Sequence, residues 1–251
     1  MIQIHFKPEE LLQRLEPKAM QLTYTSAQRI ELKDTEVIVE SGNEEVCLVC
    51  ISGQADYTYH AQSGEAVLRD ILYLPTDAQV VLKSKSAVFI RFGAPCTRKT
   101  TFAHIVFKEV DGDSRHKVYG KQENGTKRDV WNCIDEAFDS ARFLVGFCKG
   151  CPGGWTAWPP HEHAEKREET YVYFDMANAF GAQFVYDELD NPHDVALIQE
   201  GHLVSIPSGY HPNCGCPAGA ISYVYCMVST TEDDRNFMDL TTQKIYGDKL
   251  E

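Results

Sequence analysis

The sequence contains no long run of basic residues and no long run of apolar ones. Its 24 lysines and arginines stand against 37 aspartates and glutamates, which gives a formal net charge of −13. An acidic chain without a basic run does not fit a nucleic-acid groove or an anionic membrane surface. No apolar stretch approaches the roughly 20 residues that span a bilayer. A small anionic substrate stays open, because a few local cations can outweigh the overall field.

The N-terminus lacks a cationic start, an apolar core and a small-residue cleavage site, so it does not resemble a secretory signal. We therefore expect a soluble, cytosolic protein. Its nine cysteines, an odd number, are then expected to be reduced and mostly buried as small apolar residues. Cys47 and Cys50 lie on one expected strand, three residues apart, and should point to opposite faces. The alternative is a structural zinc site of four thiols. Its ligands would be Cys148, Cys151, Cys214 and Cys216.

Helical periodicity is scarce as well, and appears only over residues 8–20 and, weakly, over 132–141. Elsewhere, short apolar or alternating runs between turn residues predict an all-β protein, a sandwich or barrel with few short helices. Residues 111–129 are polar and contain glycines, so they are the predicted linker. In both halves an acidic strand start precedes an apolar strand that ends at a proline turn, which indicates two related domains. We expect these over residues 1–120 and 121–251.

Metal-binding residue types are concentrated in the second half. The stretch "WPPHEH" places His161 and His163 one residue apart, which puts both side chains on one face of an extended segment. A carboxylate at the start of the next strand, Glu168 or Glu169, could join them. Later, "GHLVSIPSGYHP" places His211 on a turn. Three imidazoles and one carboxylate suit Zn²⁺, Mn²⁺, Fe²⁺ or Ni²⁺.

These segments resemble the two cupin motifs, and "PGGWTAWPPHEH", "EETYVYF" and "PSGYHP" more closely resemble the 5-deoxy-glucuronate isomerases of inositol breakdown. That bicupin family has a sister branch, the 5-keto-4-deoxyuronate isomerases of pectin breakdown. The resemblance is strong over about residues 125–230 and thin before residue 120. Four residues separate His163 from Glu168 and five separate it from Glu169, and the second motif is one residue short before His211. The resemblance implies two jelly-roll cupin domains, the first without metal ligands.

The resemblance also implies a ligand set for one divalent metal ion, with zinc expected and manganese, iron or nickel as alternatives. His161, His163 and His211 match the family's histidines. Glu169 matches its Glu-x-Tyr-x-Tyr strand, while Glu168 fits the general cupin spacing better and remains a rival.

The implied reaction converts an aldose to a ketose, 5-deoxy-glucuronate to 5-dehydro-2-deoxy-gluconate. A metal ion would offset the negative charge of the enediolate, and a group with a suitable pKa must move the proton. An arginine would best hold the substrate's carboxylate; Arg128 lies in the family-like "GTKRDVWN", and Lys127, Arg142 and Lys166 are alternatives. The candidates for catalysis are Glu168, Tyr171 and Tyr223, and those for substrate binding are Arg128, Tyr173 and Trp155.

Three other functions stay open: the sister isomerase, an Fe²⁺ dioxygenase, and a cupin that binds a sugar without converting it. In each case we expect a small-molecule partner, here an anionic sugar acid, and neither nucleic acid nor membrane. Long β edges in a bicupin also favour self-association as a homo-oligomer.

Overall fold

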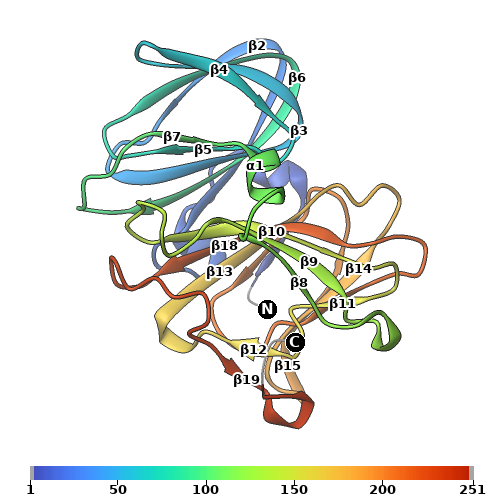
Figure 1. Ribbon diagram of the computed structural model, residues 1–251. Helices are drawn as coiled ribbons and strands as arrows, with labels where there is room; N and C mark the ends of the chain where they lie inside the picture. The colour runs from blue at the N-terminus through green and yellow to red at the C-terminus, as the bar shows by residue number, and fades with distance from the viewer. Residues whose placement is uncertain (1–2, 249–251) are drawn as a thin grey trace.

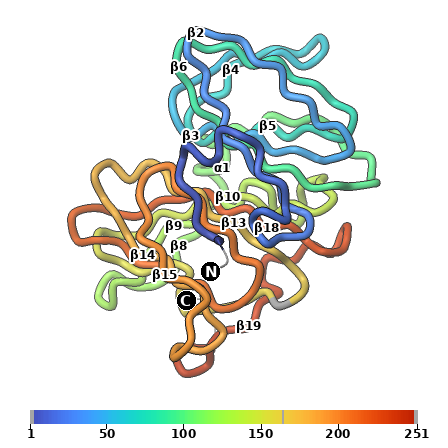
Figure 2. Tube along the Cα trace, turned by 180° about the vertical axis from the view of Figure 1, so that it is seen from behind, coloured from blue at the N-terminus to red at the C-terminus, as the bar shows by residue number. Residues whose placement is uncertain are grey.

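A computed structural model describes residues 3–248 of the chain. The described part is almost entirely β-structure with one short α-helix, α1 (Phe107–Asp111), which confirms the all-β prediction. Figures 1 and 2 show the strands of the first half gathered above those of the second half, while the dark-blue N-terminal chain runs down beside the second half. Among the described residues, no helix is long and apolar enough to cross a membrane.

The first half forms one antiparallel sheet that folds over on itself. Its long strands bend, and β4 adds to the far end of β3. The strands are, in spatial order, β2 (Ser26–Glu40), β6 (Gln79–Pro95), β3 (Glu44–Tyr59), β5 (Ile71–Leu74) and β7 (Ala103–Ile105), with β4 (Gln62–Val67) beside β3.

The second half contains a seven-stranded sheet, here called the central sheet. Its strands are, in order, β1 (His5–Phe6), β16 (Leu203–Ile206), β13 (Arg167–Tyr173), β18 (Ser222–Ser229), β10 (Phe143–Gly150), β9 (Arg128–Ile134) and β8 (His116–Tyr119). A smaller sheet lies against it, with the order β11 (Trp155–Thr156), β17 (Asn213–Gly215), β14 (Gly181–Glu188) and β15 (Asn191–Ile198). A short ladder joins β12 (His161–Glu162) to β19 (Thr241–Thr242).

Both ends of the expected first domain, residues 1–120, lie in the central sheet. The strand β1 pairs with β16, and β8 pairs with β9. The expected linker, residues 111–129, therefore holds a strand of the second half. The N-terminal segment crosses from one half to the other, so the two halves are joined by more than one connection.

Both helices expected from periodicity are absent from the structure. Residues 8–20 form two 3₁₀ turns, Pro8–Leu11 and Pro17–Met20, because the second proline interrupts the helical pattern. Over 132–141, β9 continues to Ile134, and the side chain of Asp135 then accepts hydrogen bonds from two following backbone N–H groups. This local bonding replaces the helical pattern with turns.

The central sheet is buried on both faces, because alternate residues of each strand point to opposite sides. On β18, Val224 and Cys226 pack in a core shared with the first half, while Tyr223 and Tyr225 pack toward the smaller sheet. This explains why the strand "ISYVYCMVS" has no polar face. The site described below lies on the side of the smaller sheet.

The first half has a corresponding set of four strands. The order β5–β3–β6–β2 matches β16–β13–β18–β10, and both β5 and β16 end just before a proline. In the first half Val46 pairs with Leu74, and in the second Glu169 pairs with Ile206. Val46 therefore occupies the place that Glu169 has in the second half. The interior of the first half is filled by a cluster of apolar side chains.

Cys47 and Cys50 do point to opposite faces of β3. Cys47 packs in the core between the two halves, whereas Cys50 packs inside the first half. All nine cysteines are free thiols.

Candidate metal centre

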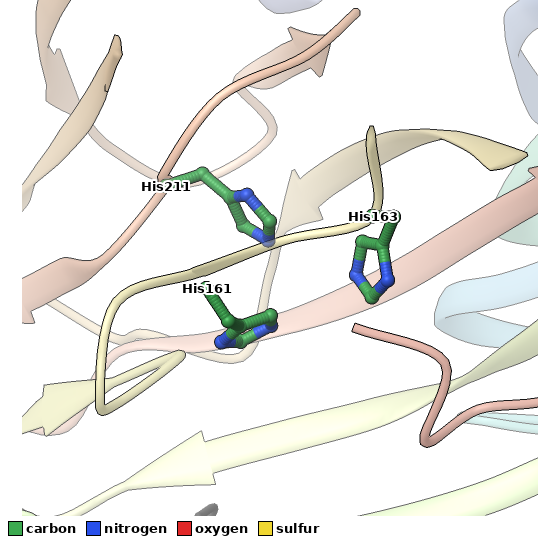
Figure 3. Close-up of side chains that lie close together, drawn as sticks. All are labelled: His161, His163 and His211. Atoms are coloured by element: carbon green, nitrogen blue, oxygen red, sulfur yellow. The ribbon is translucent and has the colours of Figure 1, made fainter. Parts of the chain in front are cut away.

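Three histidines from two separate segments converge in the second half. His161 lies on β12, His163 follows in the next turn, and His211 lies in the loop between β16 and β17. One potential ligand atom from each ring lies within 4.8 Å of the others, and all three side chains are buried. Figure 3 shows the three imidazoles pointing toward one another. The structure thus brings together the H-x-H pair and the distant turn histidine.

A backbone carbonyl lies next to the Nδ1 atom of each imidazole. When Nδ1–H donates to such a carbonyl, Nε2 carries a free lone pair that can bind a metal ion. Metal-binding histidines are commonly oriented in this way. The distances are 3.0 Å from His161 to Pro159 O, 2.9 Å from His211 to Gly209 O and 3.5 Å from His163 to Asp239 O.

Glu169 joins this cluster from β13. Its Oε2 atom lies 3.1 Å from Nε2 of His211 and 3.4 Å from Nε2 of His163. Glu169 Oε2 and His211 Nε2 are both buried, and neither has a hydrogen-bond partner. Two buried acceptor atoms facing each other without a hydrogen are what a cation between them would satisfy. This observation shows that the residues present fit a metal ion.

The charge states suit the same conclusion. Burial, together with the nearby rings of His211 and His163, lowers the pKa of His161 well below its usual value. Burial alone would raise the pKa of Glu169, but in the metal-free protein the hydrogen-bonding capacity and positive charge of the His163 and His211 rings outweigh burial and lower that pKa overall. A neutral His161 and an ionised Glu169 are the forms in which these two side chains bind a metal ion. The buried triad could therefore hold a metal ion.

Glu168 lies on the opposite face of β13 from Glu169. It does not line the cavity that adjoins the histidines. Its carboxylate accepts backbone N–H bonds from Thr23, Tyr24 and Thr25 at 2.5–2.9 Å, and a further bond from the Thr25 hydroxyl. The expectation that Glu168 reaches the substrate is not met, because adjacent strand residues face opposite sides. Glu168 instead holds the N-terminal segment.

A cavity extends from the histidines along the face of the central sheet. Tyr171 and Tyr223 line it, with their ring centroids 4.3 Å apart. Tyr223 donates to the Thr156 hydroxyl, whereas the Tyr171 hydroxyl has no hydrogen-bond partner in the described part of the chain. Burial raises the pKa of both phenols well above the usual value. Both therefore keep their protons at neutral pH and can donate hydrogen bonds.

Tyr173 shares the face of Tyr171 but lies deeper, outside the cavity lining. Its hydroxyl donates to Gln183 and accepts from Asn213. The structure therefore places Tyr173 in a buried polar network and not where a substrate would touch it.

Arg128, the predicted cation for the substrate's carboxylate, lines the cavity. It donates to the carbonyl oxygens of Thr126 and Trp158 and lies over the Tyr119 ring. Trp155 does not line the cavity; it stacks on Phe184. The alternative cations also lie elsewhere. Lys127, Arg142 and Lys166 are absent from the cavity lining.

Several cavity residues were missed by sequence reasoning. Tyr225 and Met227 alternate with Tyr223 on β18, so the period of two could have found them. Phe237 and Leu240 come from residues 234–242, a segment here called the strap, which is rich in turns and carries no motif. The strap ends in β19, which pairs with β12 at His161.

The alternative zinc site of four cysteines is not assembled. Within the described residues, the histidine triad is the one group of three or more metal-binding side chains that come together. Cys148 instead lines the cavity, where burial raises its pKa to about 11 and keeps it a neutral thiol.

Sequence comparison relates this chain to known proteins. The KduI/IolB family model matches residues 3–244. The chain is 26% identical over 235 residues to a 5-deoxy-glucuronate isomerase of Bacillus licheniformis, which covers 85% of this chain and 84% of that protein. It is also 26% identical over 208 residues to a 4-deoxy-L-threo-5-hexosulose-uronate ketol-isomerase of Cereibacter sphaeroides, covering 82% of this chain and 73% of that protein.

Solved structures share the fold. An IolB-like protein from Salmonella typhimurium LT2 superimposes with a TM-score of 0.84 at 19% identity, over 97% of this chain and 98% of that one. Oxalate decarboxylase from Bacillus subtilis, a protein with Mn(II) centres, gives a TM-score of 0.64 at 11% identity, over 97% and 80% of the two chains. These matches confirm the predicted cupin architecture.

Proposed function

Because the chain belongs to the KduI/IolB family, we propose that it is a metal-dependent isomerase that interconverts the aldose and ketose forms of a deoxy-uronate. The observation that carries this proposal is the buried cluster of His161, His163, His211 and Glu169. Two of its histidines, together with Glu169 and Arg128, line one cavity. The two kinds of relative named above act, by their names, on deoxy-uronates.

His161, His163, His211 and Glu169 would hold the ion, with zinc as our first choice and manganese, iron or nickel as alternatives. When bound, a divalent ion supplies Lewis-acid chemistry that stabilises negative charge on substrate oxygens. The rigid carbonyl contacts at Nδ1 keep the imidazoles aimed at the centre, so the protein does not have to reorganise.

Substrate binding and stabilisation of the developing charge are assigned to side chains of the cavity. We assign Arg128 to the substrate's carboxylate, because it is a cation that lines the cavity and a guanidinium matches the shape and charge of a carboxylate. Tyr171 is assigned to the oxygen that becomes negative as a proton moves between neighbouring carbons. Its phenol is protonated, faces the cavity and has no competing partner within the described chain. Tyr223, already bonded to Thr156, would support the position of Tyr171.

The favoured substrate is 5-deoxy-glucuronate, because the chain covers more of the relative named for it (84%) than of the ketol-isomerase (73%). The alternative substrate is 4-deoxy-L-threo-5-hexosulose-uronate. The first half, centred on residues 26–105, would then serve as a scaffold, since Val46 stands where a ligand would be needed.

The test combines elemental analysis with an isomerase assay on both deoxy-uronates. We expect about one divalent ion per chain, conversion of aldose to ketose without oxygen uptake, and loss of both metal and activity in the variant His161→Ala/His163→Ala. Binding of a uronate without conversion would support a sugar-binding cupin instead, and oxygen uptake would support a dioxygenase. Metal retained by the double variant would reject the site itself.

A further inference from the structure

Arg167 is a buried cation beside the metal centre that the proposed reaction does not use. It begins β13, two residues before Glu169, and its side chain is fully buried. It does not line the cavity, so it does not reach the substrate. A buried guanidinium is costly unless its donors find acceptors, which directs attention to the groups that it contacts.

Those acceptors belong to the strap. One terminal nitrogen of Arg167 donates to the carbonyl oxygen of Asp239 at 3.4 Å, and the other donates to that of Asp234 at 3.2 Å. The planar fork therefore bridges two carbonyls five residues apart and closes the strap into a fixed loop. The carboxylate of Asp239 lies 3.5 Å from the same guanidinium.

The carbonyl oxygen of Asp239 has a second neighbour, Nδ1 of His163 at 3.5 Å. For His161 and His211 the corresponding carbonyl belongs to a residue two positions earlier in the chain. His163 alone depends on a carbonyl 76 residues away in sequence. Its orientation therefore requires that the strap be held in place.

We infer that Arg167 is a positioning residue that fixes the Asp239 carbonyl and thereby aims Nε2 of His163 at the metal. The inference rests on the metal site of the proposed function. It also assigns the strap a structural role at the centre, in addition to covering the cavity with Phe237 and Leu240.

If Arg167 acted on the metal ion only through its charge, its removal would have the opposite effect on metal affinity from the one that positioning predicts. A buried cation near a metal ion repels it, so removal of the charge alone would tighten metal binding. Positioning predicts weaker binding whenever the fork is lost, even if the charge is kept. The variants Arg167→Met and Arg167→Lys separate the two, because only the second keeps the charge.

The control is Lys166→Met. Lys166 is the neighbouring, half-exposed cation, and it contacts the Asp239 carboxylate but not its carbonyl. The experiment titrates the metal-free full-length protein with Co²⁺ and records affinity and the visible absorption band. Thermal unfolding of each metal-free variant is measured in parallel, to show that it is folded.

We expect both Arg167 variants to bind Co²⁺ about ten- to a hundredfold more weakly, as is typical when the partner of a ligating histidine is lost, and to shift the absorption band. Lys166→Met should stay within about twofold of the wild type. Wild-type affinity in both Arg167 variants would overturn the inference, as would tighter binding by Arg167→Met alone. If Arg167→Met does not fold, Arg167→Lys decides; if neither folds, the residue serves folding and the inference is rejected.

The two proposals can fail separately. A wild-type protein that binds Co²⁺ but does not isomerise a deoxy-uronate rejects the proposed function and leaves the affinity test of Arg167 intact. A wild type that does both, with unchanged affinity in the Arg167 variants, rejects only the positioning role. A wild type that does not bind Co²⁺ rejects both.

Discussion

Two adjacent carboxylates on β13 serve different parts of the molecule, and the reason is the alternation of side chains along a strand. Glu169 faces the histidines, while Glu168 faces the first half and binds the backbone of the N-terminal segment. Each is buried, yet their partners differ in kind: imidazole nitrogens of His163 and His211 for Glu169, and backbone N–H groups for Glu168.

The variants Glu169→Gln and Glu168→Gln should therefore have opposite signatures. Loss of the charge at Glu169 should lower metal affinity at least tenfold and abolish most activity. Glu168→Gln should retain the metal but reduce the free energy of unfolding by about 1–3 kcal/mol, because buried N–H groups lose a charged acceptor. Metal analysis and urea unfolding check both. Metal loss in Glu168→Gln would contradict the assignment.

Tyr171 and Tyr173 provide a second matched pair. Tyr171→Phe removes a hydroxyl that faces the cavity, so we expect kcat to fall about ten- to a hundredfold with metal content and stability nearly unchanged. Tyr173→Phe removes a hydroxyl that binds Gln183 and Asn213, so its main effect should be on stability. Steady-state kinetics and thermal unfolding distinguish them. Normal kcat in Tyr171→Phe would reject its role at the developing charge.

The histidine cluster should make the metal-free protein sensitive to acid. Since burial lowers the folded-state pKa of His161 below 6.5, the unfolded chain takes up a proton that the folded chain refuses. The free energy of unfolding should fall as the pH drops below about 6.5, by up to about 1.4 kcal/mol per pH unit for each such proton. Urea unfolding of the metal-free protein between pH 7 and 5 measures this slope.

His161→Gln is the control for that slope. His5 and His202 also have lowered pKa values because of burial, and they remain in the variant. The difference between the two slopes thus isolates the contribution of His161. We expect the slope of the variant to be smaller by up to the contribution of one proton. Equal slopes would show that His161 is protonated in the folded metal-free protein.

At the scale of elements, the strands are easier to predict from the sequence than the loop segments and long-range contacts that surround them. Alternation and turn residues were sufficient to predict the β architecture and the shared direction of His161 and His163. The choice of Glu169 over Glu168 came from the family resemblance and remains a prediction. The strap could not be predicted, because Phe237 and Leu240 lie in a segment without periodicity and reach the cavity only through tertiary contacts. The same holds for the partners of Glu168, which lie more than 140 residues away in sequence.

The strand β10 also depends on a residue that sequence reasoning passed over. A Cβ atom at Gly146 would overlap the Trp131 carbonyl oxygen and the Tyr225 hydroxyl. The glycine thus lets the Tyr225 ring lie across β10, where its hydroxyl donates to Asn132 at 2.6 Å. A close approach, and not a special backbone angle, requires glycine here.

Gly146→Ala should lower the free energy of unfolding by about 1–3 kcal/mol, the usual range for overpacking, and reduce kcat by displacing Tyr225 from the cavity wall. Gly112→Ala is the matched control, because the nearest atoms to its Cβ are 3.5 Å away. Differential scanning calorimetry and kinetics check both variants. Wild-type behaviour of Gly146→Ala would mean that the sheet relaxes easily around Tyr225.

At the scale of the whole molecule, the two halves exchange equivalent contacts. Glu168 on β13 binds the backbone just before β2, and Glu45 on β3 binds the backbone N–H groups of Ala141 and Arg142, just before β10. Because β3 corresponds to β13 and β2 to β10, each half holds the entry of the other's matching strand with a buried carboxylate. The first half is therefore part of the support of the second half.

Arg69 joins the halves at another point. It comes from the turn before β5, and its guanidinium lies 5.2–5.6 Å from the ring centroids of Phe107, Trp131 and Phe174. It also pairs with Asp175 at 2.6 Å. A cation enclosed by three rings and a carboxylate links both halves through one side chain.

Arg69→Met keeps most of the apolar stem and removes these contacts, so it should lower the free energy of unfolding by about 1–2 kcal/mol. The metal affinity of the folded protein should not change, because Arg69 does not line the cavity. Lys33→Met, which removes an exposed cation of the first half, should leave the unfolding midpoint unchanged. Guanidinium unfolding followed by tryptophan fluorescence suits the test, since Trp131 lies under Arg69. Equal midpoints for the Arg69 and Lys33 variants would show that the halves are held together by the shared apolar core and the paired carboxylates alone.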